Sequence, residues 1–300
     1  MIALWLLGTC MVLGLLAARF LRPPPGLSQS LNWWVINVAL PATVLELIPR
    51  LQPDWHLWFL AASQWLVTAG SWILFAWLGG QLQWSRSRIG AIVLTCGFGN
   101  TSFIGFPLIE ALRGKEGLTY AVVADQLGCF PAASAIGITV AALYSGGEPN
   151  ARQIARKVLL FPAFLALIGG VCIGLLGGWP VTANDILARL ASTLTPLALF
   201  SVGLQFSLHL TRQQIGAVAM GLGWKLLLAP LLVYGVGRSL GIGGPTLIIS
   251  VLESGMAPMI SAAIIADQYG LEPKLANTVL SIGILISMVT VPLANTLLGG

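Results

Sequence analysis

The stretch CGFGNTSFIGFP, residues 96–107, decides the fold, because it lies in the middle of an apolar run and cannot continue as a regular helix. Proline lacks the backbone N–H and clashes with the preceding turn, and the three glycines weaken a helix further. A second apolar run carries a similar interruption, ESGMAP, at residues 253–258. We therefore predict two helices that are each interrupted near their middle.

The composition around these stretches is that of an integral membrane protein. Of 300 residues, 57% are hydrophobic and only 8% are charged, where soluble domains average about 25% charged, and the mean hydropathy is +0.89. So little polar material cannot cover a soluble fold, which excludes a soluble enzyme and a disordered chain. The scattered charges form no basic stripe, so no nucleic-acid partner is expected. Two histidines and four cysteines without metal spacing predict no metal site and no cofactor.

Ten apolar spans predict an all-α membrane protein with ten transmembrane helices, because each span has about the 20 residues that cross a bilayer. The whole chain, 1–300, then forms a single transporter unit in membrane lipid. The expected spans are 2–19, 31–49, 57–79, 89–112, 119–143, 158–177, 186–208, 214–237, 245–268 and 275–298.

The spans divide into two sets of five, which predicts an inverted repeat. Repeat one covers 1–143, a loop covers 144–157, and repeat two covers 158–300. Prolines recur at a similar spacing on the two sides of this loop. Pro41 is followed 155 residues later by Pro196, and Pro107 is followed 151 residues later by Pro258. Because five is odd, the second copy enters the membrane from the opposite side, as in many secondary transporters. The alternative is chance spacing of prolines.

The two interruptions define the candidate site, because matching broken helices in inverted halves indicate a transporter binding site. Breaking a helix frees N–H and C=O groups that lipid cannot satisfy. The alternative is a pair of kinked helices with close packing of small residues. The predicted substrate-binding residues are Asn100, Thr101, Ser102, Pro107, Asp125, Gln126, Ser254 and Pro258. A helix-two kink is assigned to Asn37 and Pro41, where Asn37 could do no more than cap its own kink.

Two charges inside predicted spans are assigned to ion coupling or charge balance. Lys225 lies near the middle of span eight, where a lysine costs roughly 2.5–3.5 kcal/mol on insertion scales. It could balance freed carbonyls or a carboxylate, or it could extend its side chain to the membrane surface. Glu253 lies beside the second break. An apolar environment would make it a proton carrier, and a nearby cation would make it an ion ligand.

These residues carry a family resemblance. Residues 99–108, GNTSFIGFPL, resemble the fourth-helix signature of the auxin efflux carrier family of permeases. Four further segments resemble its second, fifth, eighth and ninth helices: ALPA at 39–42, EGL at 116–118 with Tyr120-Ala121 and Asp125, Leu226 with PLL at 230–232, and MAP at 256–258 with Ala266 and YGL at 269–271.

The resemblance implies a sodium/proton-antiporter-type fold in which broken helices four and nine cross. It implies a scaffold of helices one, two, six and seven, which often forms a homodimer, and a transport domain made of the other six helices. The short central loop resembles the prokaryotic branch, whose members are linked to small carboxylates. The plant members carry auxin.

We therefore expect a secondary active transporter of a small organic anion, either a carboxylate or an auxin-like compound, with elevator-type alternating access and H⁺ or Na⁺ as a candidate coupling ion. The alternatives on the same fold are a sodium- or proton-coupled cation antiporter and a bile-acid-type symporter. The antiporter requires a carboxylate pair at the crossing, where the sequence places only Glu253. An intramembrane enzyme is not expected, because motifs such as H-E-x-x-H are absent. A channel would not need two broken helices.

The loop charges predict a multi-pass protein of the cell (inner) membrane with both termini extracytoplasmic. Nine Lys/Arg residues lie in loops on one predicted side and five on the other, and positive loops stay in the cytoplasm. A cysteine introduced as Gly146→Cys should be protected from an impermeant reagent in intact cells, and Gly300→Cys should be labelled. The reverse pattern would overturn the orientation.

Overall fold

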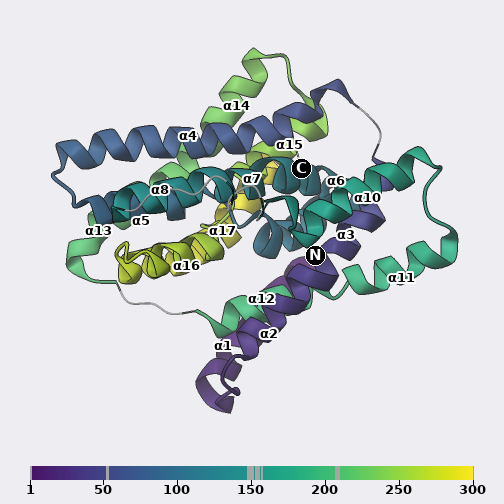
Figure 1. The fold of residues 1–300 in the computed structure, drawn as a ribbon, viewed down its shortest axis with the longest axis horizontal. Coiled ribbons are helices and arrows are strands. Elements are labelled where there is room, and N and C mark those ends of the chain that lie inside the picture. The colour runs from purple at the N-terminus through teal and green to yellow at the C-terminus, as the bar shows by residue number, and fades with distance from the viewer. Residues whose placement is uncertain are drawn as a thin grey trace. The chain divides into compact units, whose positions relative to one another are not determined.

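A computed structural model describes residues 2–51, 54–146, 152, 156, 158–206 and 210–299, and in these residues the regular structure is entirely helical (Figure 1). Gly300 and most of the 144–157 loop lie outside the described residues. The chain divides into two compact units, each built from separated segments. Unit 1 comprises 1–54, 102–122 and 159–206, and unit 2 comprises 55–101, 123–158 and 207–300.

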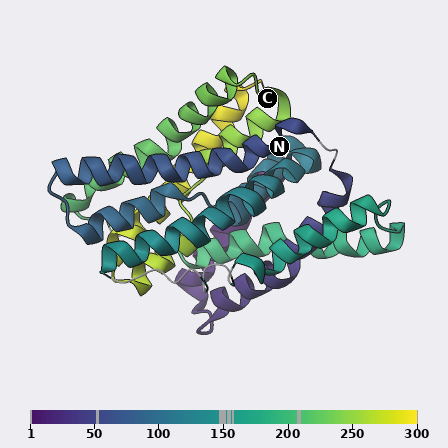
Figure 2. The same cartoon turned by 45° about the horizontal axis from the view of Figure 1, so that its top comes forward.

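Unit 1 contains the helices of the first, second, sixth and seventh expected spans, together with residues 102–122. Its helices are α1 Ile2–Leu16, η1 Ala17–Leu21, α2 Leu27–Trp34, η2 Val35–Ala39, α3 Leu40–Leu47, η3 Ile48–Arg50, α10 Pro162–Leu175, α11 Val181–Ala191 and α12 Leu194–Leu204. Within it, α1 packs along α12, and α3 packs against α10 and α11 (Figure 2). Residues 102–122 belong to η5 Thr101–Gly105 and α6 Phe106–Val123.

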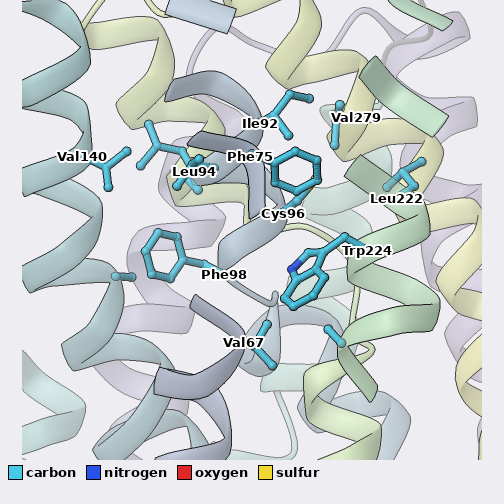
Figure 3. Close-up of a cluster of buried hydrophobic side chains, with 14 of the residues drawn as sticks. Val67, Phe75, Ile92, Leu94, Cys96, Phe98, Val140, Leu222, Trp224 and Val279 are labelled. Atoms are coloured by element: carbon cyan, nitrogen blue, oxygen red, sulfur yellow. The ribbon is translucent and has the colours of Figure 1, made fainter. Parts of the chain in front are cut away.

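Unit 2 contains the helices of expected spans three, eight, nine and ten, together with the first half of span four and most of span five. They are η4 Trp55–Leu57, α4 Trp58–Gln81, α5 Arg86–Gly97, η6 Ala124–Cys129, α7 Phe130–Ala132, η7 Ala133–Gly137, α8 Ile138–Ser145, η8 Arg212–Gln214, α13 Ile215–Gly223, η9 Trp224–Leu228, α14 Ala229–Ser239, α15 Gly244–Ser254, α16 Ile260–Gln268 and α17 Pro273–Leu297. A hydrophobic core surrounds the end of α5, and Figure 3 labels Cys96, Phe98 and Trp224 within it.

Each of the ten expected spans is helical over most of its length. Six helical segments in the described part are long and apolar enough to cross a membrane, and two shorter apolar helices, Trp5–Leu21 and Pro162–Leu175, accompany them. The long segment Thr101–Ser145 contains a non-helical residue, Gly114 (φ 65°, ψ −169°), between expected spans four and five. The protein is therefore a multi-pass, all-helical membrane protein.

Among the described residues, a proline follows a widened helical turn at five places. At four of them the helix continues past the proline, whereas before Pro23 the helix ends at Leu21. The structure describes π-helical turns η1, η2, η5, η6, η7 and η9, and five of the six end two residues before a proline. Those prolines are Pro23, Pro41, Pro107, Pro131 and Pro230. A proline has no N–H and its ring meets the carbonyl four residues earlier, so the preceding turn relaxes into a wider one. The predicted kink at Pro41 thus takes the form of a π-helical turn, η2.

Unit 1 also contains a close helix contact made by small residues. A Cβ atom built on Gly14 of α1 would collide with the backbone oxygen of Phe200, and one built on Gly203 of α12 would collide with that of Met11. Glycine lets two membrane helices approach closely enough for this packing. Gly8, on the same helix as Gly14, has no heavy atom near its added Cβ.

We expect Gly14→Leu to destabilise the protein by about 1–3 kcal/mol, because its side chain would force α1 away from α12. Gly8→Leu is the matched control and should behave as wild type. Thermal unfolding of the purified protein in detergent measures both variants. Equal melting temperatures for the two variants would contradict the described contact between α1 and α12.

Candidate functional site

The two interrupted helices pair with each other in unit 2. Helix α5 ends at Gly97, α15 ends at Ser254, and the extended segments that follow run antiparallel with Gly99 opposite Pro258. The Asn100 N–H donates to the Ala257 carbonyl at 2.7 Å, and the Met259 N–H donates to the Phe98 carbonyl at 3.2 Å. Because the pairing is antiparallel, the helix that begins at Thr101 starts beside the end of α15. Helix α16 starts beside the end of α5.

Side chains satisfy backbone groups that this pairing leaves open. The Thr68 hydroxyl on α4 donates to the Gly97 carbonyl at 3.0 Å, and the Cys129 thiol donates to the Gly99 carbonyl at 3.2 Å. The Lys225 ammonium donates to the Ser254 carbonyl at 2.9 Å. Five carbonyls at the two breaks therefore have donors, as a helix interruption within a membrane requires.

Lys225 lies at the C-terminal end of α15. Its side chain is completely buried, and the π-helical turn η9 presents it to the last carbonyls of that helix. The end of a helix carries about half a negative charge, so a cation there is favourable. In the described residues Lys225 forms no ion pair with a carboxylate. Its charge therefore compensates the helix end, which is one of the two roles that the sequence suggested.

Asp125 lies beside the start of the helix that begins at Thr101. It accepts a short hydrogen bond from the Thr101 hydroxyl and one of 2.6 Å from the Gln126 side-chain amide. All three side chains are buried, and Asp125 and Gln126 lie on the π-helical turn η6. A carboxylate beside a helix start is favourable because that end carries partial positive charge. The sequence analysis named Asp125 as a substrate-binding residue but counted only Glu253 as a carboxylate at the crossing; the structure brings Asp125 there as well, through Thr101.

Glu253 differs from the other buried charges. It is completely buried in the last turn of α15, and in the part of the chain that the structure describes neither carboxylate oxygen has a hydrogen-bond partner. The Ser250 hydroxyl, one turn earlier on the same helix, also has no partner there. A pair between Glu253 and Lys225, which the sequence left open, is not formed.

The predicted residues divide between the two units. Eight of them belong to unit 2 and surround the crossing or flank it in sequence: Asn100, Thr101, Asp125, Gln126, Lys225, Glu253, Ser254 and Pro258. The other four belong to unit 1: Ser102, Pro107, Asn37 and Pro41. Asn37 donates to the Trp33 carbonyl one turn earlier at 2.8 Å, so it caps its own widened helix.

Sequence reasoning missed the contribution of α4 and of Cys129. Gln64, Thr68 and Ser71 are buried polar residues at helical spacing on an otherwise apolar span, and Thr68 bonds the end of α5. That spacing on one helix face was a readable signal of a contact with polar backbone. Cys129 was interpreted only as a small hydrophobic residue, although a thiol is also a weak donor.

A separate group of charges lies in unit 1. Lys115 forms an ion pair of 2.6 Å with Glu46, whose side chain is buried, while Lys115 is about half exposed. Two cavities of about 390 and 410 Å³ lie beside this pair, and Arg50 lines both. This group is distinct from the crossing.

Comparison with known proteins finds relatives that are named as transporters. A 26% identical relative, an "Uncharacterized transporter" of Methanothermobacter thermautotrophicus, aligns over 90% of this chain and 89% of its own length. A 25% identical relative from Rhizobium meliloti, named "Putative malonate transporter", aligns over 93% and 89%. "Uncharacterized transporter YfdV" of Escherichia coli is 24% identical over 94% and 92%.

The family model described as "Membrane transport protein" matches residues 1–144 and 149–294, which is nearly the whole chain. It is the family of the auxin efflux carriers that the sequence motifs indicated. Its members among these relatives are named as transporters and not as enzymes. The chain therefore belongs to this family of membrane transport proteins.

Proposed function

We propose that this protein is a secondary active transporter that carries a small organic anion, such as a short carboxylate, and that its binding site is the crossing in unit 2. The observation that carries the proposal is the paired interruption of α5 and α15, surrounded by buried polar side chains. Irregular backbone within a membrane is tolerated where it lines a binding cavity.

An anion suits the crossing for two reasons. The helices that start at Thr101 and Ile260 direct N–H groups and partial positive charge toward the break. Lys225 adds a full positive charge at the same place, and its three N–H groups make one described hydrogen bond. The malonate named for the Rhizobium meliloti relative is a small organic anion of this kind.

The wider architecture belongs to the same proposal. Ten transmembrane helices would form two inverted five-helix repeats, with broken helices four and nine crossing between them. Unit 2 would form most of the moving transport domain, and unit 1 would form the scaffold and a homodimer through the first, second, sixth and seventh helices. The content of unit 1 supports this division, because those four helices make up most of it. The expected location is the inner membrane, with both termini outside.

A cation antiporter is the second candidate, and Asp125 favours it. Asp125 and Glu253 are two buried carboxyl groups near one crossing, which is the pair that such an exchanger requires. Asp125, however, already accepts two hydrogen bonds, and Lys225 repels cations from the same region. The anion is therefore the better substrate.

Uptake into proteoliposomes distinguishes the two candidates. The purified protein should accumulate or exchange radiolabelled malonate or another short carboxylate well above empty liposomes. It should not exchange Na⁺ for protons in the absence of a carboxylate. Cation exchange without carboxylate transport, for a panel that includes malonate, succinate, lactate and indole acetate, would overturn the proposal.

Asn100→Ala should reduce carboxylate uptake at least tenfold while leaving the melting temperature close to that of wild type. The reason is that Asn100 begins the helix beyond the break, where an amide can both donate to a substrate and accept from the backbone. Asn277→Ala, an exposed position on α17, is the matched control. Wild-type uptake by Asn100→Ala would remove Asn100 from the binding site.

Lys225→Met should also abolish uptake, because the substrate would lose its cation and the Ser254 carbonyl its donor. A buried carbonyl without a donor costs about 1–3 kcal/mol, so the variant should remain folded but less stable. Lys274→Met removes an exposed lysine of unit 2 and should transport normally. If Lys225→Met transports as well as Lys274→Met, the positive charge at the crossing is not needed for binding.

A further inference from the structure

Among the described residues of unit 2, Glu253 is the one buried charged side chain that the architecture of the crossing does not employ. Lys225 compensates the end of α15, and Asp125 compensates a helix start, each through described hydrogen bonds. Glu253 is as deeply buried as Lys225, yet in the described residues no donor reaches either of its oxygens. A carboxylate held in this way would lose its hydration without any replacement.

We infer that Glu253 is a proton-binding site that couples proton movement to anion transport. This inference rests on the proposed function of the crossing. A carboxyl group without donors and out of water favours its neutral, protonated form, and it can ionise when transport opens the site to water. Na⁺ fits less well, because it would need several oxygen ligands around one point, and the carbonyls at the two breaks already accept hydrogen bonds.

The charges around Glu253 determine the direction of coupling. Lys225 and Asp125 are the charged groups that act on it. Three helices pack against α15, namely α4, α14 and α17. Helix α4 carries no titratable side chain. Helix α14 carries Tyr234 and Arg238 in its second half, and α17 carries Lys274 in its first turn. Protonation of Glu253 removes the negative charge that acts on Lys225. The crossing then becomes more positive and binds an anion more tightly.

Reciprocity makes this coupling a symport. If proton binding strengthens anion binding, anion binding must strengthen proton binding by the same factor. The loaded carrier therefore carries a proton together with the anion in the same direction. When the site opens to the other side, water and loss of the anion both favour release of the proton.

The first test needs no variant. Wild-type protein in proteoliposomes with a pH-sensitive dye inside should acidify the lumen when malonate is added outside, and an inward proton gradient should accelerate malonate uptake several-fold. Malonate uptake that depends on Na⁺ and moves no protons would overturn the inference while leaving the proposed function intact. Absence of any carboxylate transport would contradict the proposed function itself.

The second test assigns the proton to Glu253. Raising the pH through the range in which Glu253 ionises should lower the malonate affinity of the wild type by up to tenfold per pH unit, the limit for one coupled proton. Glu253→Gln mimics the protonated group, so its affinity should remain at the high value and change less than twofold. Its uptake should no longer respond to a proton gradient, although malonate exchange should persist.

Asp267→Asn removes an exposed carboxylate of the same unit and should keep the wild-type pH response. If Glu253→Gln retains that response as well, Glu253 is not the proton site. If Glu253→Gln fails to fold, the absence of dye acidification by the wild type still overturns the inference.

Discussion

The structure of unit 2 depends on one constraint, which is that a helix broken inside a membrane must satisfy its own freed backbone groups. Hydrocarbon offers no hydrogen bonds, so each open carbonyl would cost several kcal/mol. The two breaks meet this cost by pairing with each other, and Thr68, Cys129 and Lys225 supply the remaining donors. The polar residues of neighbouring helices are therefore placed by the needs of the crossing backbone.

The same constraint explains how charges come to lie in an apolar interior. Lys225 and Asp125 stand at helix ends of opposite sign, where the helix itself offsets part of the cost of burial. Both residues lie on π-helical turns that end two residues before a proline. Proline thus acts twice in this chain: Pro258 lies in one of the two breaks, and other prolines widen helices that direct side chains toward the crossing. Glu253 has no such compensation, which sets it apart as a group that can change its charge.

Much of this could be predicted from the sequence. Gly and Pro at 96–107 and 253–258 are local signals, and they located both breaks correctly. The antiparallel pairing and the position of Asp125 could not be predicted, because they depend on how span five lies against span four. Thr68 and Cys129 were missed for a different reason. Their side chains serve backbone groups that exist only once the helices are broken, so neither forms a motif of its own. The ten-helix inverted repeat, the homodimer and the orientation of the termini stay predictions.

The central claim is that the crossing of unit 2 binds the transported anion. An experimentally determined structure of the protein with a transported carboxylate tests it most directly. We predict ligand density at the paired breaks, within hydrogen-bond distance of Lys225 or of the helix start at Thr101. Density in the unit 1 cavities beside Arg50, with the crossing closed and unoccupied in every state, would contradict the account.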